Sequence, residues 1–415
     1  MSAYRITLKH FFSVISILRY SRCQLYHRHN NRFSYHTPLT SNTIMRAQVL
    51  EAFNTPYVFK DVKKPDAPTG QDLLVQVQAA SYCHTDAVFA SGAMWQDLPR
   101  VGSHEFAGVI VAMGDGVSKD LGLSVGAPVG VPGRAFHPCG SCYECRVNDG
   151  DPHGYGVYCT KAGNLGLSRD GGFQEFCIVD SRQVAPMPQN MTAVDTAPLM
   201  CAGLTIWNAL QAARVTLKEG GGDGLTVAIS GAGGGLGHLG VQFAVKLGCR
   251  VVAIDASDGA LELLRQVVDS LGPLSHKVSI VDARTQTPED VRIETCGKPE
   301  NDLPGEKGVD ALLVLPEAQQ ALTYGMKLIK DHGICVTVSF PKEGFLIQPR
   351  DLVFRHIEMK GVLVGRNHQL RGMLNFAAKN NVRAKTRTYK LEDLNQLVAD
   401  YHNGVNGKLV VDMTK

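Results

Sequence analysis

The chain has 415 residues, of which 44% are hydrophobic and 20% are charged. At roughly 150 residues per domain, this length predicts two or three domains and excludes a single small module. The formal net charge is +3, but residues 1–45 contain six of the 42 Lys and Arg and none of the 39 acids. The remaining 36 basic residues therefore face 39 acidic ones, which argues against a nucleic-acid-binding surface, and the ordinary composition argues against a membrane protein.

Residues 1–44 predict a mitochondrial transit peptide. They are rich in Arg, Ser, His and Asn, lack Asp and Glu, and show no sustained helical or strand period, as is typical of such leaders. We therefore expect the protein in the mitochondrial matrix. Two alternatives stay open: residues 11–18 as the apolar part of a secretory signal, and translation from Met45, which would give a cytoplasmic form.

The chain that follows Met45 reads as an irregular β domain. Residues 73–80, 108–113 and 125–131 form apolar, strand-like stretches bounded by glycine and proline, a pattern typical of short buried strands.

A βαβ pattern begins at residue 225. An apolar strand over 225–230 leads into glycines, a helical period over 236–247 and a second strand over 250–255. Such a unit predicts a right-handed crossover and a doubly wound parallel sheet. A polar insertion rich in helix breakers follows at about 284–307.

The turn between the first strand and the helix predicts a dinucleotide site. Small residues there let a pyrophosphate approach the backbone N–H groups of the helix start. Asp255 ends the second strand, where a carboxylate accepts both adenosine ribose hydroxyls and repels a 2′-phosphate. The pattern therefore favours NAD over NADP, with a purely structural turn as the alternative. The predicted cofactor-binding residues of this unit are Gly231, Gly233, Gly234, Gly235, Leu236, Gly237 and Asp255.

Cysteines and histidines predict two metal sites. Cys83, His104 and Cys201 supply three N or S ligands, a set that suits a catalytic zinc with one open position. Cys139-Gly-Ser-Cys142-Tyr-Glu-Cys145 is a separate cluster that needs one more ligand to close a structural site. A chain of this length does not need disulfides, so these thiols indicate metal binding in a reducing compartment. An iron–sulfur centre or unliganded thiols are the alternatives.

The motifs CHTD, GSHEFAG, CGSCYEC, DGGF, LMCAGLT and ISGAGGGLGHLG occur in one order along the chain. In order and spacing they resemble the zinc-dependent medium-chain alcohol dehydrogenases, and most are similar to the yeast and fungal NAD-dependent branch. The resemblance runs from about residue 45 to the end. It implies an α/β fold with a GroES-like catalytic domain over 45–200 and 362–415 and a Rossmann NAD-binding domain over 201–361. It also implies a homo-oligomer, with a tetramer as one possibility.

The resemblance also assigns roles in the first domain. It places the catalytic zinc on Cys83, His104 and Cys201, with Glu105 as a nearby carboxylate and Asp86 as the acid that orients His104. Thr85 matches the hydroxyl that takes the proton of the alcohol. The residues matched to cofactor contacts are His84 and Lys408 near the pyrophosphate and Thr205 and Leu236 near the nicotinamide.

The fourth structural ligand has two candidates. The spacing of the family leads to His153, whereas Cys159 requires six extra residues but keeps the downstream register to the DGGF motif. We favour Cys159, because loops tolerate insertions and thiolate sites are the commoner type. The prediction is therefore two zinc ions per chain and NAD as the cofactor.

Three positions depart from the family pattern: Val88 replaces a histidine that passes protons to solvent, Arg134 replaces a pocket tryptophan, and Ala260 replaces a lysine near the ribose. We expect an oxidoreductase that interconverts a primary or secondary alcohol and its aldehyde or ketone, with NAD as the hydride carrier. One alternative is a dehydrogenase of the same fold for bulkier aldehydes or polyols. The other is a catalytically weak relative that binds NAD and zinc in a structural role.

Overall fold

The computed structural model describes residues 43–94, 97–147, 151, 154–298 and 305–415. Almost all of the predicted transit peptide and the candidate ligand His153 lie outside the described residues. Strand β1 (Ile44–Leu50) begins one residue before the predicted start of the folded chain at Met45. In the described part of the chain, no helix is both long enough and apolar enough to cross a bilayer.

The first β region is built around β3 (Asp72–Ser81) and β5 (Glu105–Met113), which pair antiparallel. Both strands were predicted, and both are confirmed. The expected strand over 125–131 is wrong at its start: β6 begins at Pro128, and Val125 is 60% exposed beside the turn glycine Gly126. The other strands of this region are β2 (Val58–Lys63), β4 (Arg100–Val101), β7 (Phe176–Asp180) and β8 (Ala185–Pro186).

The C-terminal strands return to this region. β15 (Thr386–Tyr389) and β16 (Lys408–Asp412) extend the larger sheet, whose order is β15-β16-β3-β5-β6-β8, with β7 also paired to β3. β16 lies antiparallel to β3, with Val411 opposite Ala80. Residues more than 300 positions apart in the sequence are therefore neighbours, as the predicted division of the catalytic domain into two segments requires. The domain boundaries themselves stay predictions.

A second sheet is parallel throughout and has the order β11-β10-β9-β12-β13-β14. The direction of winding reverses between β9 and β12, and ligands of such sheets bind at the carboxyl ends of the strands near this point. The predicted Rossmann-type α/β fold is confirmed. Its strands are β9 (Thr226–Ser230), β10 (Arg250–Asp255), β11 (Val278–Asp282), β12 (Val309–Val314), β13 (Ile329–Thr337) and β14 (Glu358–Gly361).

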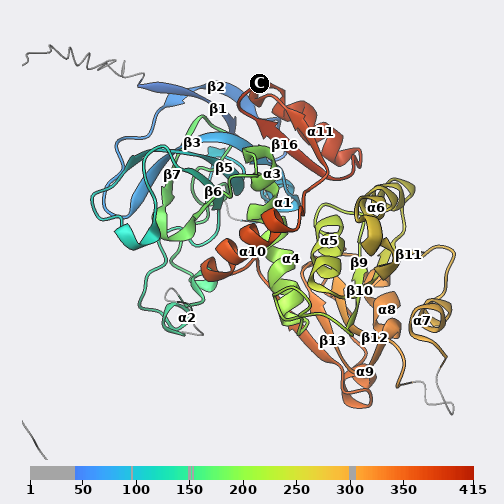
Figure 1. The fold of residues 1–415 in the computed structure, drawn as a ribbon. Coiled ribbons are helices and arrows are strands. Elements are labelled where there is room, and N and C mark those ends of the chain that lie inside the picture. The colour runs from blue at the N-terminus through green and yellow to red at the C-terminus, as the bar shows by residue number, and fades with distance from the viewer. Residues whose placement is uncertain (1–42, 95–96, 148–150, 152–153, 299–304) are drawn as a thin grey trace, which may run out of the picture. The chain divides into compact units, whose positions relative to one another are not determined.

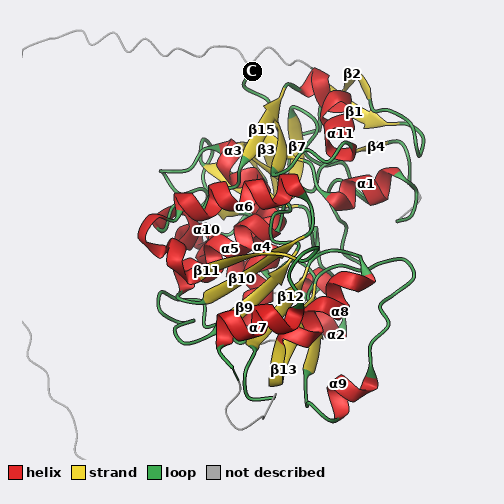
Figure 2. Cartoon of the chain, turned by 90° about the vertical axis from the view of Figure 1, so that its right-hand side faces the viewer, coloured by secondary structure: helices red, strands yellow, loops and turns green. Residues whose placement is uncertain are grey.

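Side chains alternate between the two faces of this sheet, so each face has its own core. Val227 and Ile229 belong to the core under α5 (Gly237–Leu247) and α6 (Asp258–Ser270), whereas Ala228 packs on the opposite side. α7 (Pro288–Cys296) and α8 (Gln319–Leu328) lie on that opposite side, as Figure 2 shows. α7 is a helix within the segment expected only as a polar insertion. Thr287 caps it through a hydrogen bond from the Asp290 N–H.

Helices α4 (Ala202–Ala212) and α10 (Asn367–Lys379) lie between the two sheets (Figure 1). Trp207 of α4 packs against Phe243 of α5 and Phe376 of α10, with ring centroids 5.3 and 5.0 Å away. This aromatic contact joins the parallel sheet to the C-terminal segment that leads back to β15. The other α-helices of the described chain are α1 (His84–Ala90), α2 (Tyr143–Arg146), α3 (Ala193–Thr196), α9 (Pro349–Val353) and α11 (Leu394–His402).

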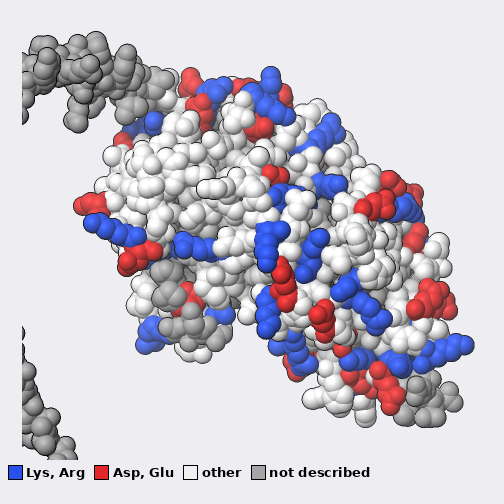
Figure 3. All heavy atoms as spheres, in the orientation of Figure 1, with Lys and Arg blue, Asp and Glu red and all other residues white. Residues whose placement is uncertain are grey.

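Basic and acidic side chains are interspersed over the face of the molecule shown in Figure 3. Exposed ion pairs occur in the described part of the chain, for example between Arg265 and Glu262 on α6. Exposed pairs of this kind contribute little to stability.

Candidate active site

Three of the predicted metal ligands meet in one buried cluster. The ligand atoms of Cys83, His104 and Cys201 all lie within 4.8 Å of one another. Cys83 precedes α1, His104 precedes β5, and Cys201 precedes α4. Three loops at the ends of separate elements therefore converge on one point.

The Asp86 carboxylate holds two of these loops together. It accepts hydrogen bonds from the N–H of Cys83 at 2.9 Å and the N–H of Ser103 at 3.1 Å, and it lies 3.2 Å from Nδ1 of His104. Asp86 is the third residue of α1, where an acidic side chain favours the helix N-terminus. The sequence prediction that this acid orients His104 agrees with the geometry.

The donor set fits a metal ion. Because Nδ1 of His104 faces Asp86, Nε2 is left to point into the cluster, and it has no hydrogen-bond partner among the described residues. Cys83 has a pKa lowered well below its usual value, chiefly by a hydrogen bond from Cys201 and in part by the charge of Lys408. Two thiols and one free imidazole nitrogen form the Cys₂His set of a zinc site with an open position. Alcohol dehydrogenase is the standard example of that set.

Glu105 and Lys408 form an ion pair beside this cluster. Both side chains are buried, and the ammonium of Lys408 donates to Glu105 Oε1 and to the carbonyl of Tyr82 at 3.0 Å. Burial raises the pKa of Glu105 to about 7, although the charge of Lys408 opposes this rise. Burial alone would lower the pKa of Lys408, but the charge of Glu105 raises it instead. The sequence predicted Lys408 as a pyrophosphate contact. In the structure its charged end is bound to Glu105, and only its stem lies near the glycine loop at Gly235.

Thr85 borders a cavity of about 160 Å³ that reaches the cluster. Its hydroxyl lies 3.9 Å from the sulfur of Cys83. The cavity is also lined by Cys201, Thr205 and Leu236, so the residues predicted near the nicotinamide share it with the reacting hydroxyl. The remaining lining is mostly apolar: besides His84, Glu317 and Ser339 it consists of Leu315, Val338, Phe340, Val362, Leu363 and Val364.

A second cavity, of about 510 Å³, adjoins the glycine loop. A Cβ atom at Gly233 would lie 2.2 Å from the carbonyl oxygen of Ala260, and one at Gly237 would lie 2.1 Å from that of Gly231. The two positions therefore require glycine so that the loop can pack against itself and against α6. Gly234 and Gly235 line the cavity and have more room, which leaves their backbone open to a ligand.

Asp255 lies at the carboxyl end of β10 beside this loop. Its carboxylate accepts hydrogen bonds from Gly233 at 2.9 Å and Ala256 at 2.8 Å. The acid is therefore fixed at the place where the βαβ unit puts the adenosine ribose.

His84 lines both cavities and has two partners that the sequence analysis missed. Its Nδ1 lies 2.9 Å from the hydroxyl of Tyr401, and its Nε2 lies 3.2 Å from Glu317. Glu317 follows the end of β12, and a strand end in a parallel sheet is a signal that could have identified it. Tyr401 comes from α11 near the C-terminus, and nothing local in the sequence indicates its place.

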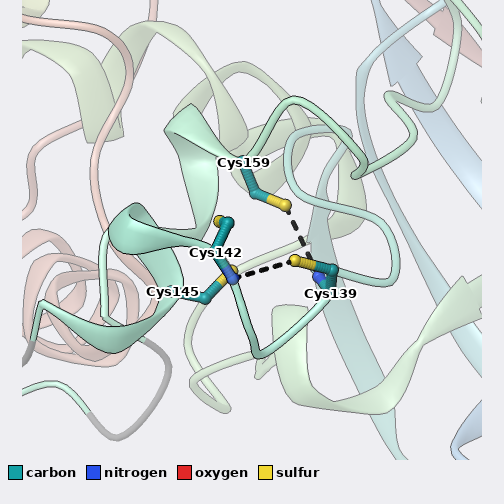
Figure 4. Close-up of side chains that lie close together, drawn as sticks. All are labelled: Cys139, Cys142, Cys145 and Cys159. Atoms are coloured by element: carbon teal, nitrogen blue, oxygen red, sulfur yellow. Dashed lines mark hydrogen bonds between the residues drawn. The ribbon is translucent and has the colours of Figure 1, made fainter.

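Figure 4 shows that the side chains of the second cysteine group lie close together. The sulfur atoms of Cys139, Cys142, Cys145 and Cys159 lie within 4.8 Å of one another. Backbone N–H groups support them, since Cys139 donates to Cys159 Sγ and Cys142 donates to Cys139 Sγ, both at 3.4 Å. Four thiols with no open position are the arrangement of a structural zinc. The structure brings Cys159, the favoured fourth ligand, into this group.

The structure also shows where the three residues that depart from the family pattern lie. Val88 lines neither of the two cavities described above. Ala260 is buried under Gly233. Arg134 is largely buried near Cys201, whose charge acts on its guanidinium.

Known proteins share these features. Residues 69–189 match the family described as alcohol dehydrogenase GroES-like domain, and residues 235–379 match the family described as zinc-binding dehydrogenase. An alcohol dehydrogenase of Geobacillus stearothermophilus is 33% identical over 88% of this chain and 99% of its own length. Alcohol dehydrogenase 1 of Emericella nidulans is 29% identical over 89% of this chain and 98% of its own. The crystal structure of the alcohol dehydrogenase from Aeropyrum pernix has a TM-score of 0.71, with 27% identity, and the match covers 88% of this chain and 99% of that one.

The chain belongs to the zinc-dependent medium-chain alcohol dehydrogenase family. It is an oxidoreductase that uses zinc and NAD to interconvert an alcohol and its carbonyl compound.

The cysteine geometry generates a metal-content prediction. Cys159→Ser should reduce the zinc content from two ions per chain to about one and lower the thermal denaturation midpoint, because a structural metal contributes its binding free energy to folding. Elemental analysis of the purified protein and calorimetry measure the two effects.

Cys296→Ser is the matched control, since Cys296 belongs to neither cysteine group and is partly exposed. It should retain both ions. If Cys159→Ser keeps both ions while His153→Ala loses one, the histidine is the fourth ligand and the choice of Cys159 is wrong.

Proposed function

We propose that this dehydrogenase acts on a small to medium primary or secondary alcohol, with the buried Cys83, His104 and Cys201 cluster as its catalytic zinc site. The single observation that carries the proposal is the convergence of that cluster with Thr85, Thr205 and Leu236 on one cavity. The metal and the hydride acceptor can therefore meet one substrate.

The proposed chemistry assigns a task to each side chain. Zinc, when bound, supplies a Lewis acid that makes the alcohol a stronger acid. The Thr85 hydroxyl would take the proton of the alcohol, and Thr205 and Leu236 would hold the nicotinamide of NAD, which would supply the hydride acceptor. Asp86 holds the His104 imidazole so that Nε2 is left to bind zinc together with Cys83 and Cys201. With Val88 at the usual histidine position, the proton leaves by a path other than an imidazole there.

An alcohol panel tests this function and its cofactor together. The zinc-loaded protein should oxidise alcohols with NAD and only weakly with NADP, because Asp255 meets a 2′-phosphate with a like charge, a contact that costs several kcal/mol. Asp255→Gly should narrow the preference for NAD by about 100-fold or more. Initial rates at 340 nm provide the measurement.

Cys201→Ser should abolish the oxidation of alcohols, whereas an exposed control such as Arg265→Met should leave it unchanged. A wild-type protein that turns over no alcohol with either cofactor contradicts the proposed function. Equal use of NAD and NADP contradicts the role of Asp255 alone.

We also propose that the chain belongs to the yeast and fungal branch of the family and forms a homo-oligomer. The branch is supported by the motifs around Cys83 and His104 and by the fungal relative, although a bacterial relative is of similar identity. The oligomer is supported by the parallel sheet, whose last strand β14 pairs within the described part of the chain only with β13. Apolar side chains are exposed just before that strand, with Val353 at 71% and Phe354 at 80%.

If the surface around β14, Val353 and Phe354 packs against a second copy of the chain, light scattering should give a molar mass at least twice the 44.9 kDa of one chain. Phe354→Glu should shift the protein toward smaller species, because a carboxylate resists burial. The exposed substitution Phe340→Glu, at a position of 54% exposure outside this segment, serves as a comparison. A monomeric wild-type protein rules out the oligomer.

We propose that residues 1–44 direct the protein to the mitochondrial matrix. The proposal is supported by their six basic residues and the lack of any acid. Fused to a fluorescent reporter, this segment should carry it into mitochondria and be removed near Ser34, as imaging and N-terminal sequencing would show.

A reporter fused to the chain from Met45 onward should stay in the cytosol, which is the matched control. Delivery of the full leader fusion to the secretory pathway, or its retention uncleaved in the cytosol, contradicts the mitochondrial assignment.

A further inference from the structure

A third cavity lies in the first β region and is separate from the active site. Its volume is about 500 Å³, which is within the range of ordinary small-molecule sites. Residues of β1, β2, β4 and β7 line it, together with the segment that precedes β7. It shares no lining residue with the two cavities that border the catalytic cluster and the glycine loop.

Part of the lining of this third cavity is apolar. The apolar side chains that carry the argument are buried or half-buried: Val49, Val62, Val101, Phe136, Leu165 and Ile178. An apolar ligand body that covers them is removed from water, which favours its binding.

Basic side chains outnumber acidic ones in the same lining. The five bases are Lys60, Lys63, Lys64, Arg100 and Arg169, and the two acids are Asp66 and Asp170. Three of the bases each pair with a carboxylate. Among the described residues, Lys64 and Arg169 have no carboxylate partner, and the ammonium of Lys64 lies over the ring of Phe176, 3.8 Å from its centroid. The cavity therefore has an excess of positive charge, which favours an anion over a cation.

Arg100 has an edge of its guanidinium that no acceptor fills well. Nη1 donates to Asp170 at 3.1 Å, whereas the buried Nε has no hydrogen-bond partner among the described residues and Nη2 reaches only the carbonyl of Asp97, at 3.5 Å. In Arg182 the corresponding Nε and Nη2 donate to the two oxygens of Asp180 at 2.9 and 2.6 Å. A carboxylate is the group that matches this edge, because its two oxygens have the spacing of the two N–H groups.

We propose that the third cavity binds a medium-chain carboxylic acid in its ionised form. The carboxylate lies on the Nε and Nη2 edge of Arg100, and the apolar chain lies against Val62, Phe136 and Ile178. The site goes beyond the proposed dehydrogenase function, since the acid is a ligand that undergoes no reaction there.

Calorimetric titration with butanoate, hexanoate and octanoate tests the site. The affinity should rise by up to about fourfold for each added methylene that the cavity buries. Octylammonium has a chain of the same kind with a positive charge, and it should not bind. Arg100→Met should weaken the binding of octanoate by about 10-fold or more, because a charge-assisted hydrogen bond is lost. Arg100→Lys should retain part of the affinity, since the charge remains without the fork geometry.

A second variant leaves the guanidinium and its pair with Asp170 in place. Ile178→Trp should fill part of the cavity and weaken the binding of octanoate, so it tests the site even if Arg100→Met does not fold. Arg265→Met, an exposed arginine on α6, is the matched control and should bind octanoate as the wild type does. Cys201→Ser should also bind it as tightly, because Cys201 does not line this cavity. The denaturation midpoint of each variant shows whether it is folded.

Two results overturn the inference. One is a wild-type protein that binds none of the three acids at millimolar concentration. The other is undiminished binding of octanoate to both Arg100→Met and Ile178→Trp. If Cys201→Ser then loses the binding, the acid lies on the catalytic metal instead.

Discussion

The active site depends on the burial of one carboxylate. Asp86 is completely buried, and an unpaired charge there would be strongly destabilising. Its oxygens are held by the N–H groups of Cys83 and Ser103 and by the ring of His104, so satisfying the acid also fixes the positions of two metal ligands. The helix start at α1 and the loop before β5 are thereby held together. Neither loop can make these hydrogen bonds without the other. Formation of this network therefore also brings the metal ligands Cys83 and His104 together.

The second constraint on the active site is the pairing of the C-terminal strand β16 with β3. Lys408 is the first residue of β16, and pairing of β16 with β3 carries its ammonium to Glu105. Removal of either partner would leave a buried charge, at a cost of about 3–5 kcal/mol. The ion pair therefore connects β16, near the C-terminus, to Glu105, which follows the metal ligand His104. Glu105 also reaches the backbone N–H of Ala202 at 3.4 Å, next to the third ligand Cys201, so the same carboxylate lies between all three parts of the site.

Local patterns predicted the parts of the molecule that are determined by neighbours in the sequence. The βαβ unit from β9 to β10 follows from its apolar periods and its glycines. The register to the DGGF motif favoured Cys159 over His153, and Cys159 lies in the cysteine group. The resemblance predicted that Cys83, His104 and Cys201 would meet, but other contacts across large sequence distances were not predicted. Tyr401 reaches His84 only because α11 packs near β16, and the charged end of Lys408 turns to Glu105 instead of facing the glycine loop. The helix α7 was missed for another reason: its segment is polar, and the cap at Thr287 was not used as a signal.

The cofactor loop is linked to the C-terminal segment through the buried His238, a residue of the ISGAGGGLGHLG motif to which the sequence analysis assigned no role. His238 lies in α5, and its Nε2 accepts a hydrogen bond from the backbone N–H of Lys385 at 3.1 Å. A backbone N–H can only donate, so Nδ1 carries the proton and donates it to the carbonyl of Gly234 at 2.9 Å. Burial lowers the pKa of His238 to about 4, which keeps the ring neutral and this pattern of donors constant at physiological pH. The ring that donates to the loop carbonyl thus also accepts a hydrogen bond from the segment that leads to β15 and β16. The backbone N–H of Lys408 donates to the carbonyl of Lys385 at 2.8 Å, so hydrogen bonds connect the glycine loop through His238 and Lys385 to the residue that pairs with Glu105.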